Sequence, residues 1–215
     1  MRKCDVDYSL YLVTDRAMAA GRSLGDMVAS AVAGGCTVVQ IREKEAGTGA
    51  FYERALRLKA VTDALQVPLI VNDRVDIMLA VGAAGVHLGQ SDLPADVARG
   101  IIGPEKILGV SAQTLEQAQK AEWDGADYLG VGAVFPTTTK TDAEAVTLET
   151  LRSICQTVHI PVVAIGGVSR KTMSALAGTG ISGVAVVSDI MKDPRPGEAA
   201  RALRAAVDGV RERHR

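Results

Sequence analysis

Polar residues stand at the ends of short apolar runs in the first half of the chain. Gln40, Arg42 and Lys44 follow one run at every second position, Asn72-Asp73 closes the next, and Asp92 follows a third. Arginine and lysine bind phosphate oxygens, and carboxylates from neighbouring loops supply the hard oxygen ligands that Mg²⁺ prefers. Cations and carboxylates that converge at strand ends therefore predict a bound complex of Mg²⁺ with a diphosphate.

Each of these groups also has a simpler explanation. The cations could form a solvated cluster with Glu43 and Glu45, while Asn72-Asp73 and Asp92 both precede helical patterns and could cap them. Such roles account for each group separately but not for their occurrence on neighbouring strand ends. His87 also comes near the end of an apolar run, where a hydrogen-bonded core imidazole is commoner than a base or a ligand.

The second half of the chain offers groups that suit another anion. Gly130 and Gly132 remove side chains from one face of an apolar run, which leaves volume for a flat ligand, and residues 137–140 then supply hydroxyls and one positive charge. Farther on, Gly166-Gly167 and Val187-Ser188 follow apolar runs, where exposed backbone N–H groups favour phosphate. We expect a second, metal-free anion site there. The alternatives are a solvent-exposed threonine loop and a plain glycine turn.

These residues need elements that bring them together. Strand-like runs occupy residues 8–13, 37–41, 68–71, 85–88, 106–110, 128–134, 161–165 and 183–187. Helical patterns occupy residues 24–33, 50–65, 74–81, 95–101, 115–123, 148–157, 171–177 and 198–210. This alternation predicts an α/β chain folded as a single-domain (β/α)8 TIM barrel over residues 1–215, in which the carboxyl ends of all strands share one rim. If the aliphatic residues of the second run face the helices, the polar trio at its end faces that rim. An open doubly wound sheet is the alternative, but no G-x-G-x-x-G follows the first run.

Composition and charge exclude several classes of protein. With 215 residues and 47% hydrophobic content, the chain is long enough for one well-buried domain. Its 24 basic and 25 acidic residues are interspersed, which argues against nucleic acid and acidic membrane surfaces as partners. No apolar stretch approaches about 20 residues, and the start of the chain turns acidic where a signal peptide would turn apolar, so we expect a cytoplasmic protein. Three scattered cysteines fit neither a disulfide framework nor a zinc site, and the sequence leaves a homo-oligomer open.

In these segments the chain resembles thiamine phosphate synthase (thiamine-phosphate pyrophosphorylase), and the resemblance covers nearly its whole length. The matching segments are YLVTD at 11–15, VQIREK at 39–44, VNDRVD at 71–76, GVHLGQSDLP at 85–94, GVS at 109–111, VFPTTTK at 134–140, AIGG at 164–167 and VS at 187–188. Each segment is short, but their order and their position at strand ends make the set specific. Ser91, where members of the family often carry an acidic residue, is the one departure at the rim, and it leaves Asp92 intact.

The resemblance implies two substrates and their contacts. The first, 4-amino-5-hydroxymethyl-2-methylpyrimidine diphosphate, would be bound by Gln40, Ile41, Arg42, Glu43, Lys44, Asn72, Ser111 and Lys140. Of these, Arg42, Lys44, Ser111 and Lys140 would be catalytic, and Asp73 and Asp92 would hold one Mg²⁺ per active site. The thiazole phosphate, with or without its carboxylate, would be bound by Thr137, Thr138, Thr139, Gly167, Val187 and Ser188.

The implied reaction is a transfer that makes thiamine phosphate. The thiazole nitrogen replaces diphosphate on the pyrimidine methylene carbon, and the electron-rich aminopyrimidine favours ionisation before attack. Cations beside the leaving group would stabilise its charge, so no protein nucleophile is required.

Three alternative functions are open, the first within the same family and the other two outside it. A thiazole tautomerase of the same family would need no diphosphate or metal site, and the intact Arg42, Lys44, Asp73 and Asp92 argue against it. A sugar-phosphate isomerase would need a base that only His87 could supply, and a non-catalytic phosphate sensor would release no product. Diphosphate release with both substrates and Mg²⁺ distinguishes the synthase from all three.

Overall fold

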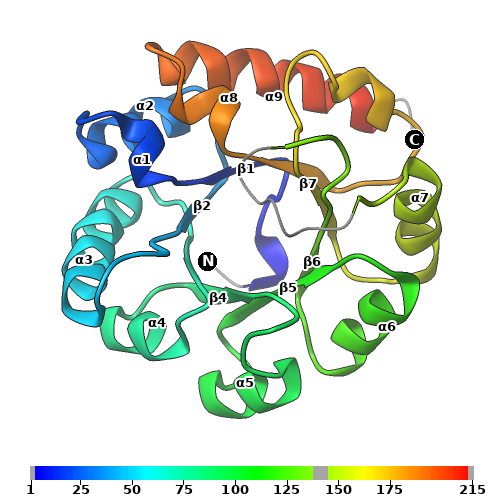
Figure 1. Ribbon diagram of the computed structural model, residues 1–215, viewed down its shortest axis with the longest axis horizontal. Helices are drawn as coiled ribbons and strands as arrows, with labels where there is room; N and C mark the ends of the chain where they lie inside the picture. The colour runs from blue at the N-terminus through cyan, green and yellow to red at the C-terminus, as the bar shows by residue number, and fades with distance from the viewer. Residues whose placement is uncertain (1–2, 138–144, 213–215) are drawn as a thin grey trace.

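Eight parallel strands close into a barrel that a ring of helices surrounds (Figure 1). This computed structural model describes residues 3–137 and 145–212. The strands are β1 (Leu10–Val13), β2 (Val38–Ile41), β3 (Leu69–Asn72), β4 (Gly85–Leu88), β5 (Ile107–Ala112), β6 (Tyr128–Val131), β7 (Val162–Ile165) and β8 (Gly183–Val186). Each strand pairs in parallel with its neighbours in sequence, and β1 pairs with β8 to close the barrel. The predicted (β/α)8 fold is confirmed.

Helices cover the outside of the barrel. They are α1 (Arg16–Ala19), α2 (Leu24–Ala33), α3 (Thr48–Ala64), α4 (Val75–Val81), α5 (Ala95–Ile102), α6 (Leu115–Trp123), α7 (Leu148–Thr157), α8 (Ser188–Met191) and α9 (Pro196–Glu212), with 3₁₀ turns η1 (Lys3–Asp5) and η2 (Met173–Leu176). The hydroxyls of Ser23, Thr114 and Thr147 accept hydrogen bonds from backbone N–H groups of α2, α6 and α7. These caps satisfy otherwise unpaired donors, and these three helices have the bounds that the sequence predicts. None of the described helices combines the length and the apolar character needed to cross a membrane.

The largest departures from the predicted elements concern one helix and one strand. The segment 171–177 forms only the 3₁₀ turn η2, because it buries just Met173 and Leu176 before Gly178 takes a left-handed conformation at φ 74°. The sixth strand ends at Val131 instead of residue 134. Beyond it the chain stays hydrogen-bonded to the end of β7, because Val134 N donates to the Ile165 carbonyl at 3.0 Å.

Side chains of the strands divide between two cores. Alternate residues such as Leu12, Val39 and Ile41 pack outward in the large cluster under the helices. The inner cluster is formed by Tyr8, Tyr11, Val13, Val38, Ile70, Ile107, Tyr128, Val163 and Ala185. Such inward layers fill a TIM barrel and leave the carboxyl ends of the strands as the place for a site.

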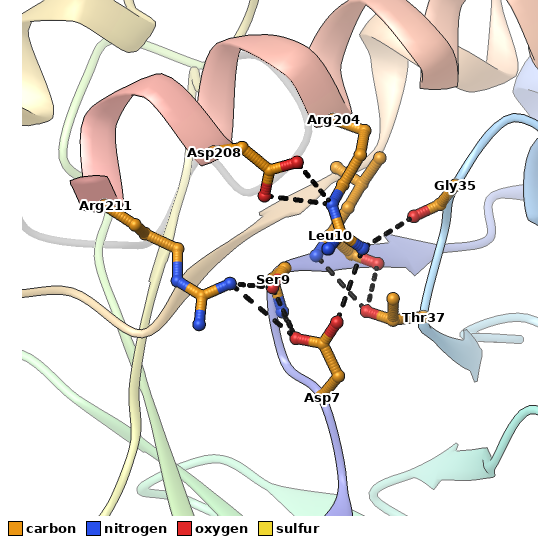
Figure 2. A network of polar contacts seen from close by, with 8 residues as sticks. All are labelled: Asp7, Ser9, Leu10, Gly35, Thr37, Arg204, Asp208 and Arg211. Atoms are coloured by element: carbon orange, nitrogen blue, oxygen red, sulfur yellow. Dashed lines mark hydrogen bonds and ion pairs between the residues drawn. The ribbon is translucent and has the colours of Figure 1, made fainter.

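A polar network joins α9 to the start of β1 (Figure 2). Asp7 accepts a hydrogen bond from Ser9 N at 2.9 Å, and its carboxylate lies 3.3 Å from Arg204 Nη1 and 3.8 Å from Arg211 Nη1. Arg204 Nε also binds both carboxylate oxygens of Asp208 at 3.0 Å. These contacts fix the later part of α9 to the segment that enters β1, at the amino end of the barrel and away from the rim where the site is predicted.

Candidate active site

A cavity of about 700 Å³ lies at the carboxyl ends of the strands. Most of the predicted residues line it: Gln40, Arg42, Lys44, Asn72, Asp73, Asp92, Ser111, Thr137, Gly167, Val187 and Ser188. The barrel therefore brings the ends of β2 to β5 and of β7 and β8 to one space. Thr138, Thr139 and Lys140 lie outside the described residues.

Ile41 and Glu43 point away from this space. Ile41 is fully buried in the outer core, and Glu43, whose side chain is 4% exposed, forms an ion pair with Arg54 of α3. Alternation along β2 explains the difference, because it places Ile41 and Glu43 on the face opposite Gln40 and Arg42. Glu43 thus fixes the loop after β2 to the neighbouring helix, while its neighbours on either side face the cavity.

Two carboxylates, those of Asp73 and Asp92, meet at the ends of β3 and β4. Asp73 has φ 63°, a left-handed conformation that aspartate tolerates better than most residues, and its N–H donates to the His87 carbonyl at 2.9 Å. Asp92 Oδ2 accepts from Gly89 N at 2.7 Å. Burial raises the pKa of Asp92, and the adjacent Asp73 carboxylate raises it further, against the lowering effects of the Gly89 N–H and of Lys44. The two acids therefore repel each other, and a cation between them would relieve that repulsion.

Helix capping does not explain these carboxylates. The N-cap residue of α4 is Arg74 and that of α5 is Pro94, and within the described chain neither helix has a side-chain capping bond. The capping alternative for Asp73 and Asp92 is therefore wrong, and both side chains line the cavity instead.

The acidic pair fits Mg²⁺ on the chemistry of its donors. Mg²⁺ in proteins is commonly held by one or two carboxylates, and substrate phosphates and water complete its octahedron. Among residues 3–137 and 145–212, no group of three or more His, Cys, Asp or Glu side chains forms a complete metal cage. Asp73 and Asp92 suit an ion that arrives with a phosphorylated substrate.

Two cations flank the acidic pair. Lys44 Nζ lies 2.8 Å from Asp73 Oδ2, and the Lys44 side chain is 53% exposed. Arg42 is held at both ends, because its backbone N donates to Thr14 Oγ1 at 3.2 Å and its Nη1 lies 3.6 Å from Asp15 Oδ2. An anchored guanidinium and a half-exposed ammonium thus both line the cavity, where a diphosphate would meet them.

The loops after β7 and β8 form the opposite side of the cavity, mainly from backbone groups; we call this side the glycine-lined arc. Gly166 and Gly167 have φ of 90° and 64°, and a Cβ on Gly167 would lie 2.5 Å from the Pro136 carbonyl oxygen. Only glycine lets the loop after β7 pack this closely against the loop after β6. Thr172 Oγ1 donates to the Gly167 carbonyl at 3.1 Å and holds the turn in place. Ser188 begins α8 across from this turn, so small residues and backbone groups line this side.

Comparison with known proteins places the chain in a family. A family model described as thiamine monophosphate synthase matches residues 10–190. The chain belongs to the thiamine monophosphate synthase family. It is similar to a thiamine-phosphate synthase of Alkaliphilus oremlandii (strain OhILAs), with 54% identity over 202 residues that cover 94% of this chain and 97% of the relative. It is also similar to one of Ruminiclostridium cellulolyticum, with 57% identity over 189 residues, 88% of this chain and 90% of the relative. A solved thiamine phosphate pyrophosphorylase from Pyrococcus furiosus superposes with a TM-score of 0.87 at 41% identity, over 95% of this chain and 98% of that one.

In this member of the thiamine monophosphate synthase family, the floor of the cavity contains residues that were not predicted. Tyr11 and Tyr128 line it beside His87, whose ring nitrogens are hydrogen-bonded to Tyr128 and Ser111, as expected for a core imidazole. Alternation indicates that Tyr11 shares a face with Val13, but the sequence does not say which face is inward. The sequence predicts that Gly130 leaves volume for a flat ligand. His87 occupies part of that volume, because a Cβ on Gly130 would lie 3.0 Å from His87 Cε1.

Proposed function

We propose that this protein catalyses the thiamine-phosphate synthase reaction with Mg²⁺, by a dissociative substitution. The observation that carries the proposal is the presence, in one cavity, of a cation and carboxylate arc and a glycine-lined arc. Similarity to thiamine-phosphate synthases over 94% of the chain supports the same reaction. The substrates are then a pyrimidine diphosphate and a thiazole phosphate.

The two arcs accept the two phosphorylated ends. Arg42, Lys44 and Asn72 would bind the diphosphate, and the carboxylates of Asp73 and Asp92 would hold Mg²⁺. Backbone groups near Gly167 and Ser188, with the Thr137 hydroxyl, would bind the thiazole phosphate. Anchoring both ends would bring the thiazole nitrogen and the pyrimidine methylene carbon together within the cavity.

The chemistry breaks one bond and makes one. The C–O bond to diphosphate breaks with its electron pair on oxygen, and the lone pair of the thiazole nitrogen forms the new C–N bond, so the bond exchange itself requires no general base. Bound Mg²⁺ would neutralise part of the charge that develops on the diphosphate. Arg42 and Lys44 would stabilise the same charge, each by up to about 4 kcal/mol for a pair 4 Å apart at an effective dielectric near 20. Lys140 would do likewise, and we expect Lys140→Ala to slow single-turnover chemistry more than it weakens thiazole phosphate binding.

The test is to mix the protein with both substrates and Mg²⁺ and to measure diphosphate and thiamine phosphate together. The proposal expects both products in equal amounts, and neither when any one component is omitted or Mg²⁺ is chelated. Conversion of the thiazole alone would identify a tautomerase, and binding without products a sensor. Either result would overturn the proposal. The cytoplasmic location, the homo-oligomer and the preferred thiazole stay predictions.

A further inference from the structure

The floor of the cavity is a continuous chain of side-chain hydrogen bonds across the barrel. Gln40 Nε2 donates to the Tyr11 hydroxyl at 2.9 Å, and the Tyr11 and Tyr128 hydroxyls lie 2.8 Å apart. Tyr128 OH lies 2.9 Å from His87 Nδ1, and His87 Nε2 lies 2.9 Å from Ser111 Oγ. We name Tyr11, Tyr128 and His87 the phenol-imidazole chain. Its ends are the Gln40 amide and the Ser111 hydroxyl, which both line the cavity.

With the Gln40 amide nitrogen placed on Tyr11, counting hydrogens gives this chain one direction. Because an amide nitrogen only donates, the Tyr11 oxygen accepts from Gln40 and directs its own proton to Tyr128. Tyr128 then donates to His87 Nδ1, which leaves the ring proton on Nε2. Nε2–H donates to Ser111 Oγ, so the Ser111 hydroxyl proton is directed into the cavity. Every hydroxyl and ring proton in the chain then has an acceptor.

Burial and packing hold the chain in this state. Tyr11 and Tyr128 are each 1% exposed, and burial raises the pKa of both phenols, so both keep their protons at neutral pH. Two glycines make the space: a Cβ on Gly109 would lie 2.2 Å from Tyr128 Cζ, and one on Gly130 would lie 3.0 Å from His87 Cε1. The aromatic rings therefore fill volume that side chains on β5 and β6 would otherwise occupy.

We propose that the phenol-imidazole chain positions the Gln40 amide and the Ser111 hydroxyl, and so presets the half of the cavity that receives the pyrimidine diphosphate. Its members are positioning residues, since they act through Gln40 and Ser111. The inference rests on the proposed function. Preset donors and acceptors need no reorganisation when the substrate binds, which is how fixed polar groups assist catalysis.

The direction of the chain matters for an anionic ligand. As it stands, Ser111 offers a proton to the cavity. Turning over the Gln40 amide would reverse every bond, direct the Ser111 proton to His87 Nε2 and leave serine lone pairs facing the diphosphate. An anion binds donors, so at the Ser111 end of the chain this direction suits an anionic ligand.

The first test needs no activity. Nitrogen NMR of ¹⁵N-histidine protein distinguishes protonated from unprotonated ring nitrogens, and a His87→Gln variant assigns the signals. We expect a proton on Nε2 and none on Nδ1 of His87 in the parent protein. A ring protonated on Nδ1 would overturn the proposal. In Tyr128→Phe the donor to Nδ1 is lost, so the ring should no longer hold a single tautomer; an unchanged spectrum would also overturn it.

The second test separates positioning from general stability. Tyr11→Phe and Tyr128→Phe each remove one hydroxyl from the chain. Tyr8→Phe is the matched control, because its ring packs 4.7 Å from Tyr128 in the same inner core, yet its buried hydroxyl has no hydrogen-bond partner among the described residues. Steady-state rates are measured with each substrate varied while the other is saturating.

We expect kcat/KM for the pyrimidine diphosphate to fall roughly tenfold or more in Tyr11→Phe and Tyr128→Phe, with the KM for thiazole phosphate within about twofold of the parent value. Tyr8→Phe should match the parent in both. A KM for thiazole phosphate that rises roughly tenfold, an unchanged kcat/KM for the pyrimidine diphosphate, or an equal loss of that kcat/KM in Tyr8→Phe would each overturn the proposal. If the parent makes no diphosphate, the proposed function fails, and the NMR measurement still decides whether the chain has the direction stated.

Discussion

Replacing Lys44 by methionine tests whether the ammonium group contributes to turnover and not to the stability of the barrel. The Lys44 ammonium contacts Asp73 at 2.8 Å, but its side chain is 53% exposed. Exposed pairs of this kind contribute about 0–1 kcal/mol to the free energy of unfolding, because solvent screens them. We therefore expect Lys44→Met to fold with nearly the stability of the parent.

The effect on turnover should be much larger. The ammonium faces the space assigned to the diphosphate, and one charge pair 4 Å apart is worth about 4 kcal/mol at an effective dielectric near 20 and about 1 kcal/mol in bulk water. A half-exposed lysine lies between these limits. Since each 1.36 kcal/mol is about tenfold in rate, diphosphate release should slow by roughly 5-fold to 1000-fold.

Single-turnover diphosphate release at saturating substrates and Mg²⁺ measures this loss, and urea unfolding measures stability. The control is Lys59→Met on α3, which removes the same charge from an ion pair with Asp63. Lys59 is not among the residues that line the cavity. A Lys44→Met rate within about twofold of the parent, or an equal loss of rate in Lys59→Met, would exclude a role for the Lys44 charge in diphosphate release.

Three further outcomes follow from the structure. Asp92→Asn should abolish most Mg²⁺-dependent turnover with an unchanged circular dichroism spectrum, whereas parent-like turnover would remove Asp92 from the metal site. Gly109→Ala places a Cβ 2.2 Å from Tyr128 and should lower the free energy of unfolding, measured in urea, by about 1–3 kcal/mol. The control Gly100→Ala, in open space on α5, should raise it by about 0.5–1 kcal/mol. Equal effects of the two substitutions would contradict the close packing of Gly109 against Tyr128. Burial alone would raise the pKa of Asp7. Hydrogen bonds from Ser9 and the charges of Arg204 and Arg211 outweigh burial, and the pKa lies below its ordinary value of 3.8. The ionised Asp7 carboxylate therefore stabilises the fold fully above about pH 4, and this contribution is lost as the pH falls through the lowered pKa. The difference in free energy of unfolding between the parent and Asp7→Asn should shrink towards about pH 2. A difference that grew towards low pH would contradict this assignment.

Much of the fold was predictable because local signals agree with the closed barrel. Apolar runs of strand length alternate with amphipathic patterns, and capping residues such as Ser23, Thr114 and Thr147 fix where helices begin. The turn η2 was not predictable as such, because its seven-residue pattern has apolar residues at helical spacing. Its small buried surface and the glycine that follows decide against an α-helix.

The charged arc of the site was predictable and its floor was not. The residues Arg42, Lys44 and Asp73 are polar and stand at strand ends. Such residues come together in space only where the carboxyl ends of the strands share one rim. Tyr11 and Tyr128 sit inside apolar runs, and whether such a side chain faces the helices or the barrel axis depends on how the strands close. For Glu43, alternation with Arg42 indicates the opposite face, and its ion pair with Arg54 agrees.

We propose that one cavity holds a divalent cation at the carboxylates of Asp73 and Asp92 and a phosphate at the loops of Gly167 and Ser188. Anomalous diffraction from crystals grown with Mn²⁺, diphosphate and thiamine phosphate tests it most directly. We expect one Mn²⁺ peak between the carboxylates of Asp73 and Asp92, in contact with the diphosphate, and the ester phosphate at the backbone of Gly167 and Ser188. An ion bound away from both carboxylates, or a phosphate at the amino end of the barrel, would contradict it.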